Sequence, residues 1–305
     1  MAKKFETISD YWVQDKKQYV KLSTICAYKA ILRTHVLPFF GKMNGITERS
    51  VQDFVFKLLK ANLSTKTVKD ALVVVKMICR FATKKKLMNV EMMDIVFPTR
   101  EKKDRICILS KRDERKLADY LHQNFSFRNL GILICLVTGM RIGEICALCW
   151  SDIDSNNGEI VVNKTIQRVY LNEPNEKTRL LIDVPKTVCS QRRIPLCSSL
   201  LTTIKPLLRS STPSFYVLSN DLKPIEPRVY RKYFESIVEK LGIPKIKFHG
   251  LRHTFATRCI ESNGDYKTVS SILGHSNITT TLNLYVHPNK DQKRKCIEKM
   301  LRSVQ

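Results

Sequence analysis

Apolar and polar positions follow a helical spacing through the first hundred residues of the chain. In the most regular stretch the apolar side chains recur every three or four residues, at Val68, Leu72, Val75, Cys79 and Ala82. This spacing places them on one face of a helix, which is expected to bury that face. Ser64 and Thr47 stand where N-cap residues are expected, and Ser23 is predicted to cap an earlier helix that ends near Pro38. The pattern predicts a small helical bundle.

The pattern changes twice further along the chain. Residues 98–108 open with a polar, charged run without periodicity, which indicates a linker. Helical spacing returns after Ser110, but from Glu159 to Leu196 short runs of strand character separated by turn signals predict a small antiparallel sheet. Helical spacing then resumes. We therefore predict a mainly α protein with a small antiparallel sheet (α+β), made of a helical domain at residues 1–97 and a second domain at residues 109–305.

The net charge of the chain limits the classes of partner that it is expected to bind. The chain has 53 Lys and Arg residues and 28 Asp and Glu residues, which gives a net charge of +25. An excess of this size favours a polyanionic partner, and we expect a nucleic acid. On the helix after Ser64, the face opposite the apolar positions is basic, with Lys66, Lys69, Lys76 and Arg80. A solvated surface is the plain alternative, but the overall charge favours contacts with phosphates.

Other classes of function are disfavoured by what the sequence lacks. The most apolar window is too short to span a bilayer and the N-terminus has no signal-peptide pattern, so we expect a cytoplasmic, nucleoid-associated protein with no membrane partner. The ten cysteines are irregularly spaced, as in reduced cytosolic proteins. Cys146 and Cys149 have CxxC spacing but no second pair of ligands nearby, so neither a metal nor a cofactor is expected.

Several residues of the second domain have side chains that can bind and activate a phosphodiester. Arg141 opens a helical run after Thr-Gly, where free backbone N–H groups and a guanidinium can hold phosphate oxygens. Glu144 lies three residues on, on the same helix face, and can hold Arg141. His249 and Arg252 share a face in the same way, whereas His253 points elsewhere and is interpreted as a packing residue.

Two more candidate groups follow. His275 comes directly after Leu-Gly, a helix stop, and Tyr285 falls on the next predicted helix. An imidazole can accept or donate a proton near neutral pH, and a phenol can act as a nucleophile. The combination of guanidinium, imidazole and phenol groups indicates phosphoryl chemistry.

These motifs resemble those of the tyrosine recombinases, also called phage-type integrases. The resemblance rests on five segments in the family's order: Thr-Gly-Met-Arg141-Ile-Gly-Glu144, Pro-Lys186-Thr, His249-Gly-Leu-Arg252-His, Leu-Gly-His275 and Leu-Asn-Leu-Tyr285-Val-His. The N-terminal helices are similar to the family's helical, SAM-like core-binding domain, and the second domain is similar to its catalytic domain. The resemblance covers nearly the whole chain.

The resemblance implies a reaction on double-stranded DNA. Tyr285 would attack phosphorus and form a 3′-phosphotyrosine, and His249 would accept the phenol proton. Lys186 would protonate the departing 5′-oxygen, with Lys164 and Lys177 as competing lysines. Because the phosphotyrosine conserves the energy of the broken bond, the reaction would need no cofactor.

The resemblance also implies how the phosphate is held. Arg141 and Arg252 would bind its non-bridging oxygens, and His275 would hydrogen-bond to one of them. Strand exchange would proceed through a Holliday junction. The family's arrangement places the DNA between the two domains.

An assembly is implied as well. The family commonly forms a homotetramer on two DNA sites by exchange of C-terminal tails, and here the tail carries an apolar stripe of Ile297, Met300, Leu301 and Val304. Folding back of the tail on its own domain is the alternative. Accessory DNA-bending or directionality proteins are further candidate partners. Because core-binding helices are predicted almost from the first residue, we expect either an Xer-type enzyme without the arm-binding domain of many integrases or a chain from which that domain has been removed.

Three other functions fit parts of the pattern: an Xer-type resolvase of chromosome or plasmid dimers, a type IB topoisomerase, and a non-catalytic DNA-binding protein. The tail stripe and the core-binding domain weigh against the topoisomerase. The complete set of candidate catalytic side chains weighs against a protein that only binds.

Overall fold

The computed structural model describes residues 3–88, 90, 94–98, 107–173, 176–184 and 190–285, and beyond them residues 294, 297, 298 and 300–302. For residues 172, 173, 280 and 283–285 it describes the backbone alone. The chain divides into two compact units, Met1–Lys103 with Val169–Arg179, and Asp104–Arg168 with Leu180–Gln305. They are called the N-terminal and the C-terminal unit below, and each has a hydrophobic core of its own.

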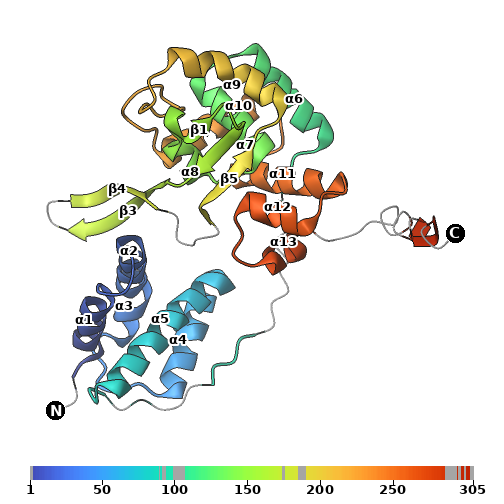
Figure 1. The fold of residues 1–305 in the computed structure, drawn as a ribbon. Coiled ribbons are helices and arrows are strands. Elements are labelled where there is room, and N and C mark those ends of the chain that lie inside the picture. The colour runs from blue at the N-terminus through green and yellow to red at the C-terminus, as the bar shows by residue number, and fades with distance from the viewer. Residues whose placement is uncertain are drawn as a thin grey trace. The chain divides into compact units, whose positions relative to one another are not determined.

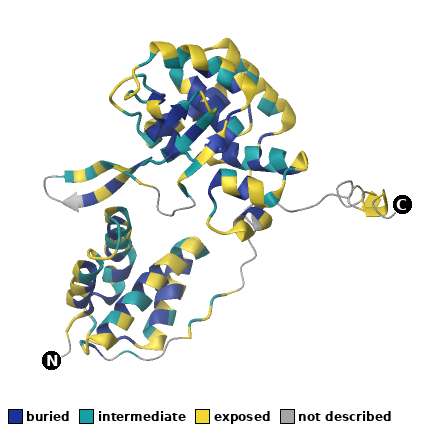
Figure 2. Ribbon diagram, viewed as in Figure 1, coloured by how far each residue is buried: buried dark blue, intermediate teal, exposed yellow. Residues whose placement is uncertain are grey.

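The helices of the N-terminal unit form a bundle (Figure 1): α1 (Phe5–Lys16), α2 (Leu22–Ile31), α3 (Leu37–Phe40), α4 (Glu48–Lys60) and α5 (Thr65–Lys84). All five apolar positions predicted for one face of α5 are buried, and buried and exposed residues alternate along this helix (Figure 2). Thr47 accepts a hydrogen bond from the backbone N–H of Ser50, and Ser64 accepts one from Thr67. Both predicted N-caps are therefore confirmed.

The prediction for Ser23 is wrong. The second helix begins one residue earlier, at Leu22, with Lys21 in the cap position. It also continues past Pro38, because the chain passes through a π-helical turn, η1 (Leu32–Val36), directly into α3. The π-helical turn ends two residues before Pro38, and the helical path runs on to Phe40, so the proline does not end it.

The C-terminal unit is mainly helical, with α6 (Lys111–Gln123), α7 (Phe127–Thr138), α8 (Ile142–Ala147), α9 (Ser198–Ser210), α10 (Pro227–Lys240), α11 (His249–Glu261), α12 (Tyr266–Leu273) and α13 (Ile278–Tyr285). A short 3-10 helix, η2 (Trp150–Asp152), leads into the sheet. Within the described part of the chain, every helix is too short or too polar to cross a membrane.

The main sheet has the order β1 (Ile153–Asp154), β2 (Glu159–Val162) and β5 (Arg192–Pro195), with antiparallel pairing on both sides of β2. Ile160 of β2 lies opposite Ile153 and Ile194. A separate two-stranded sheet pairs β3 (Thr165–Glu173) with β4 (Glu176–Asp183). The predicted fold class, mainly α with small antiparallel sheets, is confirmed.

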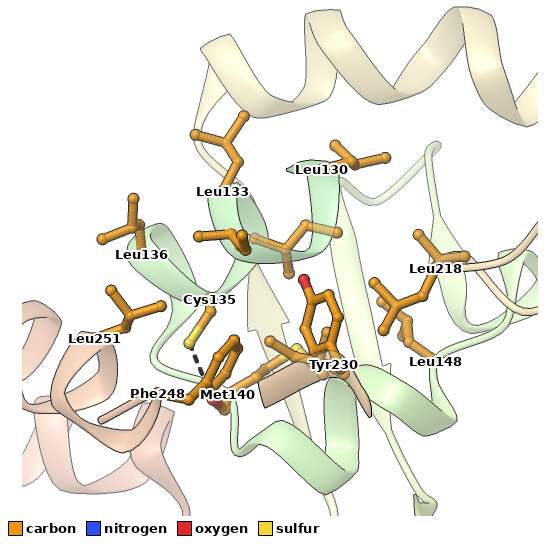
Figure 3. Packing of buried hydrophobic residues seen from close by; sticks show 14 of the residues in the cluster. Leu130, Leu133, Cys135, Leu136, Met140, Leu148, Leu218, Tyr230, Phe248 and Leu251 are labelled. Carbon is orange, nitrogen blue, oxygen red and sulfur yellow. Dashed lines mark hydrogen bonds between the residues drawn. The ribbon is translucent and has the colours of Figure 1, made fainter. Parts of the chain in front are cut away.

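Helix α7 lies in the middle of the C-terminal core, and nearly all of its residues are buried. Figure 3 shows Leu130, Leu133 and Leu136 of this helix among the packed side chains, with Tyr230 and Phe248 close by. The buried Tyr230 hydroxyl donates a 2.7 Å hydrogen bond to the Arg128 carbonyl, so its polar atom is satisfied. This packing fixes where α7 ends, and the first part of the candidate site follows directly.

Candidate active site

Two helix junctions build the site. At the first, α7 ends at Gly139, whose φ of 64° is the left-handed conformation that glycine adopts most easily. Arg141 then takes the N-cap position of α8. At the second junction, α12 ends at Gly274 with a φ of 65°, and the backbone N–H of His275 donates to the Ser270 carbonyl at 3.1 Å. The Arg141 side chain reaches the second junction, where it donates to the Gly274 carbonyl, and His275 follows Gly274 directly.

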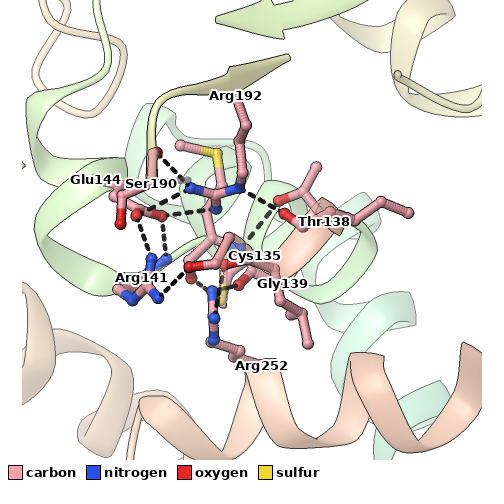
Figure 4. A network of polar contacts seen from close by, with 12 residues as sticks. Cys135, Thr138, Gly139, Arg141, Glu144, Ser190, Arg192 and Arg252 are labelled. Atoms are coloured by element: carbon pink, nitrogen blue, oxygen red, sulfur yellow. Dashed lines mark hydrogen bonds and ion pairs between the residues drawn. The ribbon is translucent and has the colours of Figure 1, made fainter. Parts of the chain in front are cut away.

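Three arginines meet the C-terminal end of α12. They donate hydrogen bonds to three successive carbonyl oxygens: Arg192 Nε to Ile272 at 2.5 Å, Arg252 Nη2 to Leu273 at 2.7 Å, and Arg141 Nη2 to Gly274 at 3.0 Å. The last carbonyls of a helix lack intrahelical donors and form the negative end of its dipole. Arg252 also donates from Nη1 to the Gly139 carbonyl at 2.8 Å, so it ties the two junctions together (Figure 4).

Glu144 is the buried centre of this network. Its carboxylate accepts four hydrogen bonds, from the backbone N–H and Nη1 of Arg141 and from Nη1 and Nη2 of Arg192, at 2.8 to 3.1 Å. Burial alone would raise the pKa of the Glu144 carboxyl. The hydrogen bond and charge of Arg192, with the charge of Arg141, outweigh burial and hold the pKa below its usual value. The group is therefore a carboxylate at neutral pH.

The side chain of His249 lies beside that of His253, one helical turn along α11, with the two ring centroids 4.6 Å apart. His249 reaches the surface, but the protein around it still removes water from one side of the ring. This burial, together with the positive charges of His253, Arg252 and Arg141, lowers the pKa of His249 to about 4. His249 is therefore a neutral imidazole at physiological pH and able to accept a proton.

His275 is placed by the helix that follows it. Its Nδ1 atom lies 2.8 Å from the hydroxyl oxygen of Thr281, a fully buried residue of α13. Burial, followed by the charges of Arg252 and Arg141, lowers the pKa of His275 to about 4. With Nδ1 paired to Thr281, the other ring nitrogen is the one available to a bound phosphate.

Two of the predicted catalytic residues, Tyr285 and Lys186, have side chains that the structure does not describe. Tyr285 is the last residue of α13, whose first turn is capped by Asn277 through a 2.8 Å hydrogen bond from the Thr279 N–H. The backbone of Tyr285 is described and its side chain is not. Lys186 lies outside the described residues. The competing Lys164 makes a 2.9 Å ion pair with Asp152.

Sequence reasoning did not identify Arg192 as part of the site. A signal was present, because side chains alternate between the two faces of a strand. Ile194 is buried and Arg193 is exposed, so Arg192, two residues before Ile194, faces inward. Its side chain is 6% exposed, compared with 61% for Arg193. An arginine that faces the core needs a buried acceptor, and Glu144 is that acceptor.

Beside the network lies an open hollow of about 360 Å³, lined by Gln191, Arg192, Lys267, Ser270, Ser271, Gly274, His275 and Ile278. Its lining includes two basic side chains, Arg192 and Lys267, beside polar and apolar ones. Cys146 is buried in the core and burial raises the pKa of its thiol. Among the described residues, no three His, Cys, Asp or Glu side chains gather in a way that could hold a metal ion.

The sequence matches the phage integrase family over residues 107–292, and the N-terminal SAM-like domain of phage integrases over residues 4–59. The first match covers more than half of the chain. The chain belongs to the phage integrase family. The family predicted from the motifs, that of the tyrosine recombinases, is thereby confirmed.

Individual members of this family are similar to different extents. A tyrosine recombinase XerC-like protein of Caldanaerobacter subterraneus subsp. tengcongensis is 33% identical over 183 residues, which are 54% of this chain and 47% of that protein. The chain thus spans about half the length of that relative. Tyrosine recombinase XerC of Bacillus licheniformis is 26% identical over 304 residues, 96% of this chain and 95% of that protein.

Two solved structures show the same fold. The integrase of transposon Tn1549, in complex with a circular intermediate DNA, has a TM-score of 0.77 at 21% identity and covers 96% of this chain and 99% of its own. A λ integrase tetramer bound to a Holliday junction has a TM-score of 0.64 at 16% identity, with 93% and 77% covered.

Proposed function

We propose that this integrase-family protein is a site-specific DNA recombinase that cuts and rejoins double-stranded DNA through a 3′-phosphotyrosine at Tyr285. The observation that carries the proposal is the meeting of Arg141, Arg252 and His275 at the C-terminal end of α12, directly before the helix that ends in Tyr285. Cations and hydrogen-bond donors at one point are what a phosphodiester needs if it is to accept a nucleophile.

In the proposed reaction, the Tyr285 oxygen attacks phosphorus, and the bond from phosphorus to the 5′-oxygen of the next nucleotide breaks. His249 takes the phenol proton, and Lys186 gives a proton to the departing 5′-oxygen. The products are a 3′-phosphotyrosine and a free 5′-hydroxyl, and ligation is the same step in reverse with a 5′-hydroxyl from another strand. The number of phosphoester bonds is unchanged, so no cofactor is required.

The protonation state of His249 is the one that its proposed role requires. A free phenol has a pKa of about 10, so it needs a base at neutral pH. His249 is neutral there because burial and its cationic neighbours lower its pKa to about 4. Arg141 is the most open of the three arginines, with a side chain that is 36% exposed, and we assign to it the first contact with the phosphate. Arg252, at 1%, contributes its charge from beneath.

We propose that the N-terminal unit supplies further contacts to the DNA backbone. The exposed side of α5 carries Lys66, Lys69 and Arg80, opposite its buried face.

The domain boundaries we propose are 1–97, 98–108 as linker, and 109–305. In support, Val96 exchanges two backbone hydrogen bonds with the Gln52 side chain of α4, and Leu109 bonds to Thr254 and Arg258 of α11.

For the assembly we propose a homotetramer on two DNA sites, formed by exchange of C-terminal tails. The tail offers apolar side chains for such a contact, because Ile297, Met300 and Leu301 are each more than half exposed. The λ integrase of the comparison is a tetramer on a Holliday junction. Truncation of the chain after Pro288 is expected to abolish tetrameric complexes with two duplexes, and unchanged tetramers would refute tail exchange.

The same active site would serve integration, excision or the resolution of dimers. The match to XerC along nearly the whole chain keeps an Xer-type resolvase as the second candidate. A plasmid with two sites separates these outcomes. Sites in direct repeat that are resolved efficiently without reverse recombination would favour the resolvase, and efficient joining of sites on two molecules would favour the integrase. Accessory DNA-bending or directionality proteins would be sought by adding a host extract to the same assay.

The experiment that tests the proposal uses a site recovered by selection from randomised duplexes. In a version of this site with a nick close to the cleavage position, cleavage releases a short fragment that carries the free 5′-hydroxyl. Without this hydroxyl the strand cannot be rejoined, so the covalent complex accumulates. We expect a protein–DNA band that resists denaturation with the wild type and is absent with Tyr285→Phe. Exchange between two labelled duplexes is then expected for a recombinase, whereas relaxation of supercoils without exchange would point to a topoisomerase.

A further inference from the structure

Arg192 lies behind the proposed phosphate site rather than in it. Its guanidinium has five N–H donors, and the described hydrogen bonds use four of them. Two go to the Glu144 carboxylate, at 3.1 and 2.9 Å, one goes to the Ile272 carbonyl and one to the Ser190 carbonyl at 3.1 Å. This side chain is therefore committed to the protein.

We propose that Arg192 is a positioning residue for the reaction: it balances the charge of Glu144, so that Arg141 keeps its positive charge for the phosphate, and it fixes the end of α12, so that His275 faces the same phosphate. This inference rests on the proposed function, because it assigns a supporting role within that active site.

The charge balance of the cluster carries the first half of the proposal. Arg141, Arg192 and Arg252 bring three positive charges to the end of α12, and Glu144 brings one negative charge, which leaves a net charge of +2. A phosphodiester carries one negative charge, and attack by a phenolate brings a second. The cluster therefore matches the charge of the transition state.

Removal of Arg192 would change this balance in a defined way. Glu144 would remain buried, with Arg141 as its one remaining cationic partner among these residues. The charges of Arg141 and Glu144 would cancel, so Arg252 alone would give the cluster its net charge of +1. The transition state carries a charge of −2. Arg141 would also be drawn toward the carboxylate and away from the phosphate. The loss would fall on the chemical step rather than on DNA binding, which the many other basic residues support.

The hydrogen bond to Ile272 carries the second half. Three arginines hold three successive carbonyls at the end of α12, and Arg192 holds the first of them. His275 follows two residues after the last helical residue, Leu273. A shift of this helix end would therefore move His275 and the Gly274 carbonyl that Arg141 contacts. A displacement of about 1 Å in a catalytic constellation can lower a rate about 10²-fold.

The test compares Arg192→Met with Arg193→Met, a matched control at the next position, where the arginine is 61% exposed and pairs with Glu159 at the surface. Two quantities are measured on the nicked duplex: the dissociation constant, by fluorescence anisotropy, and the single-turnover rate of covalent complex formation. We expect Arg192→Met to slow covalent complex formation on the order of 10²-fold with a dissociation constant within a few-fold of the wild type. Arg193→Met is expected to leave the rate near that of the wild type.

A second variant distinguishes positioning by charge from loss of folded structure. In Arg192→Met combined with Glu144→Gln, the uncompensated carboxylate is gone and Arg141 with Arg252 restores a net charge of +2. We expect this double variant to react about tenfold faster than Arg192→Met alone. Arg192→Lys should recover part of the rate, because a lysine keeps the charge but cannot form the two-pronged contact with Glu144.

The outcomes separate this inference from the function on which it rests. If the wild type forms no covalent complex, the proposed function fails and the role of Arg192 fails with it. If the wild type reacts and Arg192→Met reacts at the same rate, this inference alone is overturned. A double variant that is slower than Arg192→Met would also overturn it, because a purely structural role predicts that the two losses accumulate.

Discussion

The buried carboxylate of Glu144 gives the sharpest prediction for stability. The side chain is almost fully buried and accepts four hydrogen bonds from Arg141 and Arg192. Glu144→Ala removes both carboxylate oxygens and with them all four hydrogen bonds. Arg141 can turn toward water, because its side chain is 36% exposed, but Arg192, at 6%, cannot. The variant therefore leaves one buried guanidinium without its carboxylate.

The size of the loss follows from these contacts. Removal of one partner from a buried ion pair destabilises a protein by about 3–5 kcal/mol. Loss of the carboxylate bond to the backbone N–H at the start of α8 adds roughly 0.5–2 kcal/mol, in part overlapping. The pair with Arg141, whose side chain is 36% exposed, contributes less than about 1 kcal/mol. We expect a net loss of about 4 kcal/mol, which for a unit of this size lowers Tm by roughly 8–16 °C.

The assay uses the two tryptophans of the chain, because Trp12 is buried in the N-terminal core and Trp150 in the C-terminal core. In a Trp12→Phe background, the fluorescence of Trp150 reports unfolding of the C-terminal unit alone, so urea titration gives its free energy of unfolding. Glu159→Ala is the control, since Glu159 pairs with an exposed arginine at 3.3 Å and should cost less than about 1 kcal/mol. A loss for Glu144→Ala as small as that of the control would refute the reasoning.

Three more predictions concern packing, pH and the proton acceptor. A Cβ at Gly131 would lie 2.1 Å from Leu218 Cδ2 and 2.5 Å from the Tyr230 hydroxyl, so Gly131→Ala should lower the free energy of unfolding by about 1–3 kcal/mol; a neutral effect, as expected for the open Gly45→Ala, would contradict the packing. The pKa of His275 is lowered to about 4 by burial and then by the charge of Arg252, whereas in the unfolded chain it lies near 6.5. Its contribution to stability is therefore complete above about pH 6.5 and is lost as pH falls toward 4. Between pH 7.5 and pH 4.5, the loss in the free energy of unfolding, measured by urea titration, should be smaller in His275→Gln than in the wild type. The expected difference is roughly 1–2 kcal/mol after allowance for partial exposure, and equal losses in the two proteins would count against the burial of this ring. His249→Gln should slow covalent complex formation by at least about 10²-fold and make it rise with pH, as the phenol ionises unaided; an unchanged pH profile would exclude His249 as the base.

Local sequence signals predicted the parts of the fold that depend on local physics. The caps at Thr47 and Ser64 follow from side chains that bond to nearby backbone N–H groups, and the structure contains both. The helix stop at Gly274 follows from the left-handed conformation that glycine permits. Ser23 misled because a polar residue inside a first turn looks like a cap in the sequence, while the structure begins the helix one residue earlier.

The candidate site was predictable as a set of residues but not as a network. The motifs name Arg141, His249, Arg252, His275 and Tyr285, yet no local rule connects β5 to the end of α12. The role of Arg192 depends on its contacts with Glu144 and Ile272. These residues lie 48 and 80 positions from it along the chain, so only folding brings them together. The partner of His275, Thr281, was missed for a related reason, because a threonine on an amphipathic helix gives no sign of being buried.

The central claim is that Tyr285 becomes covalently joined to the 3′-phosphate of the cleaved strand. The direct measurement is mass spectrometry of the trapped complex after digestion with protease and nuclease. The account predicts a nucleotide linked through its 3′-phosphate to the peptide that contains Tyr285, together with a released strand whose 5′-hydroxyl accepts phosphate from a kinase. A nucleotide on another residue, or a linkage through a 5′-phosphate, would contradict it.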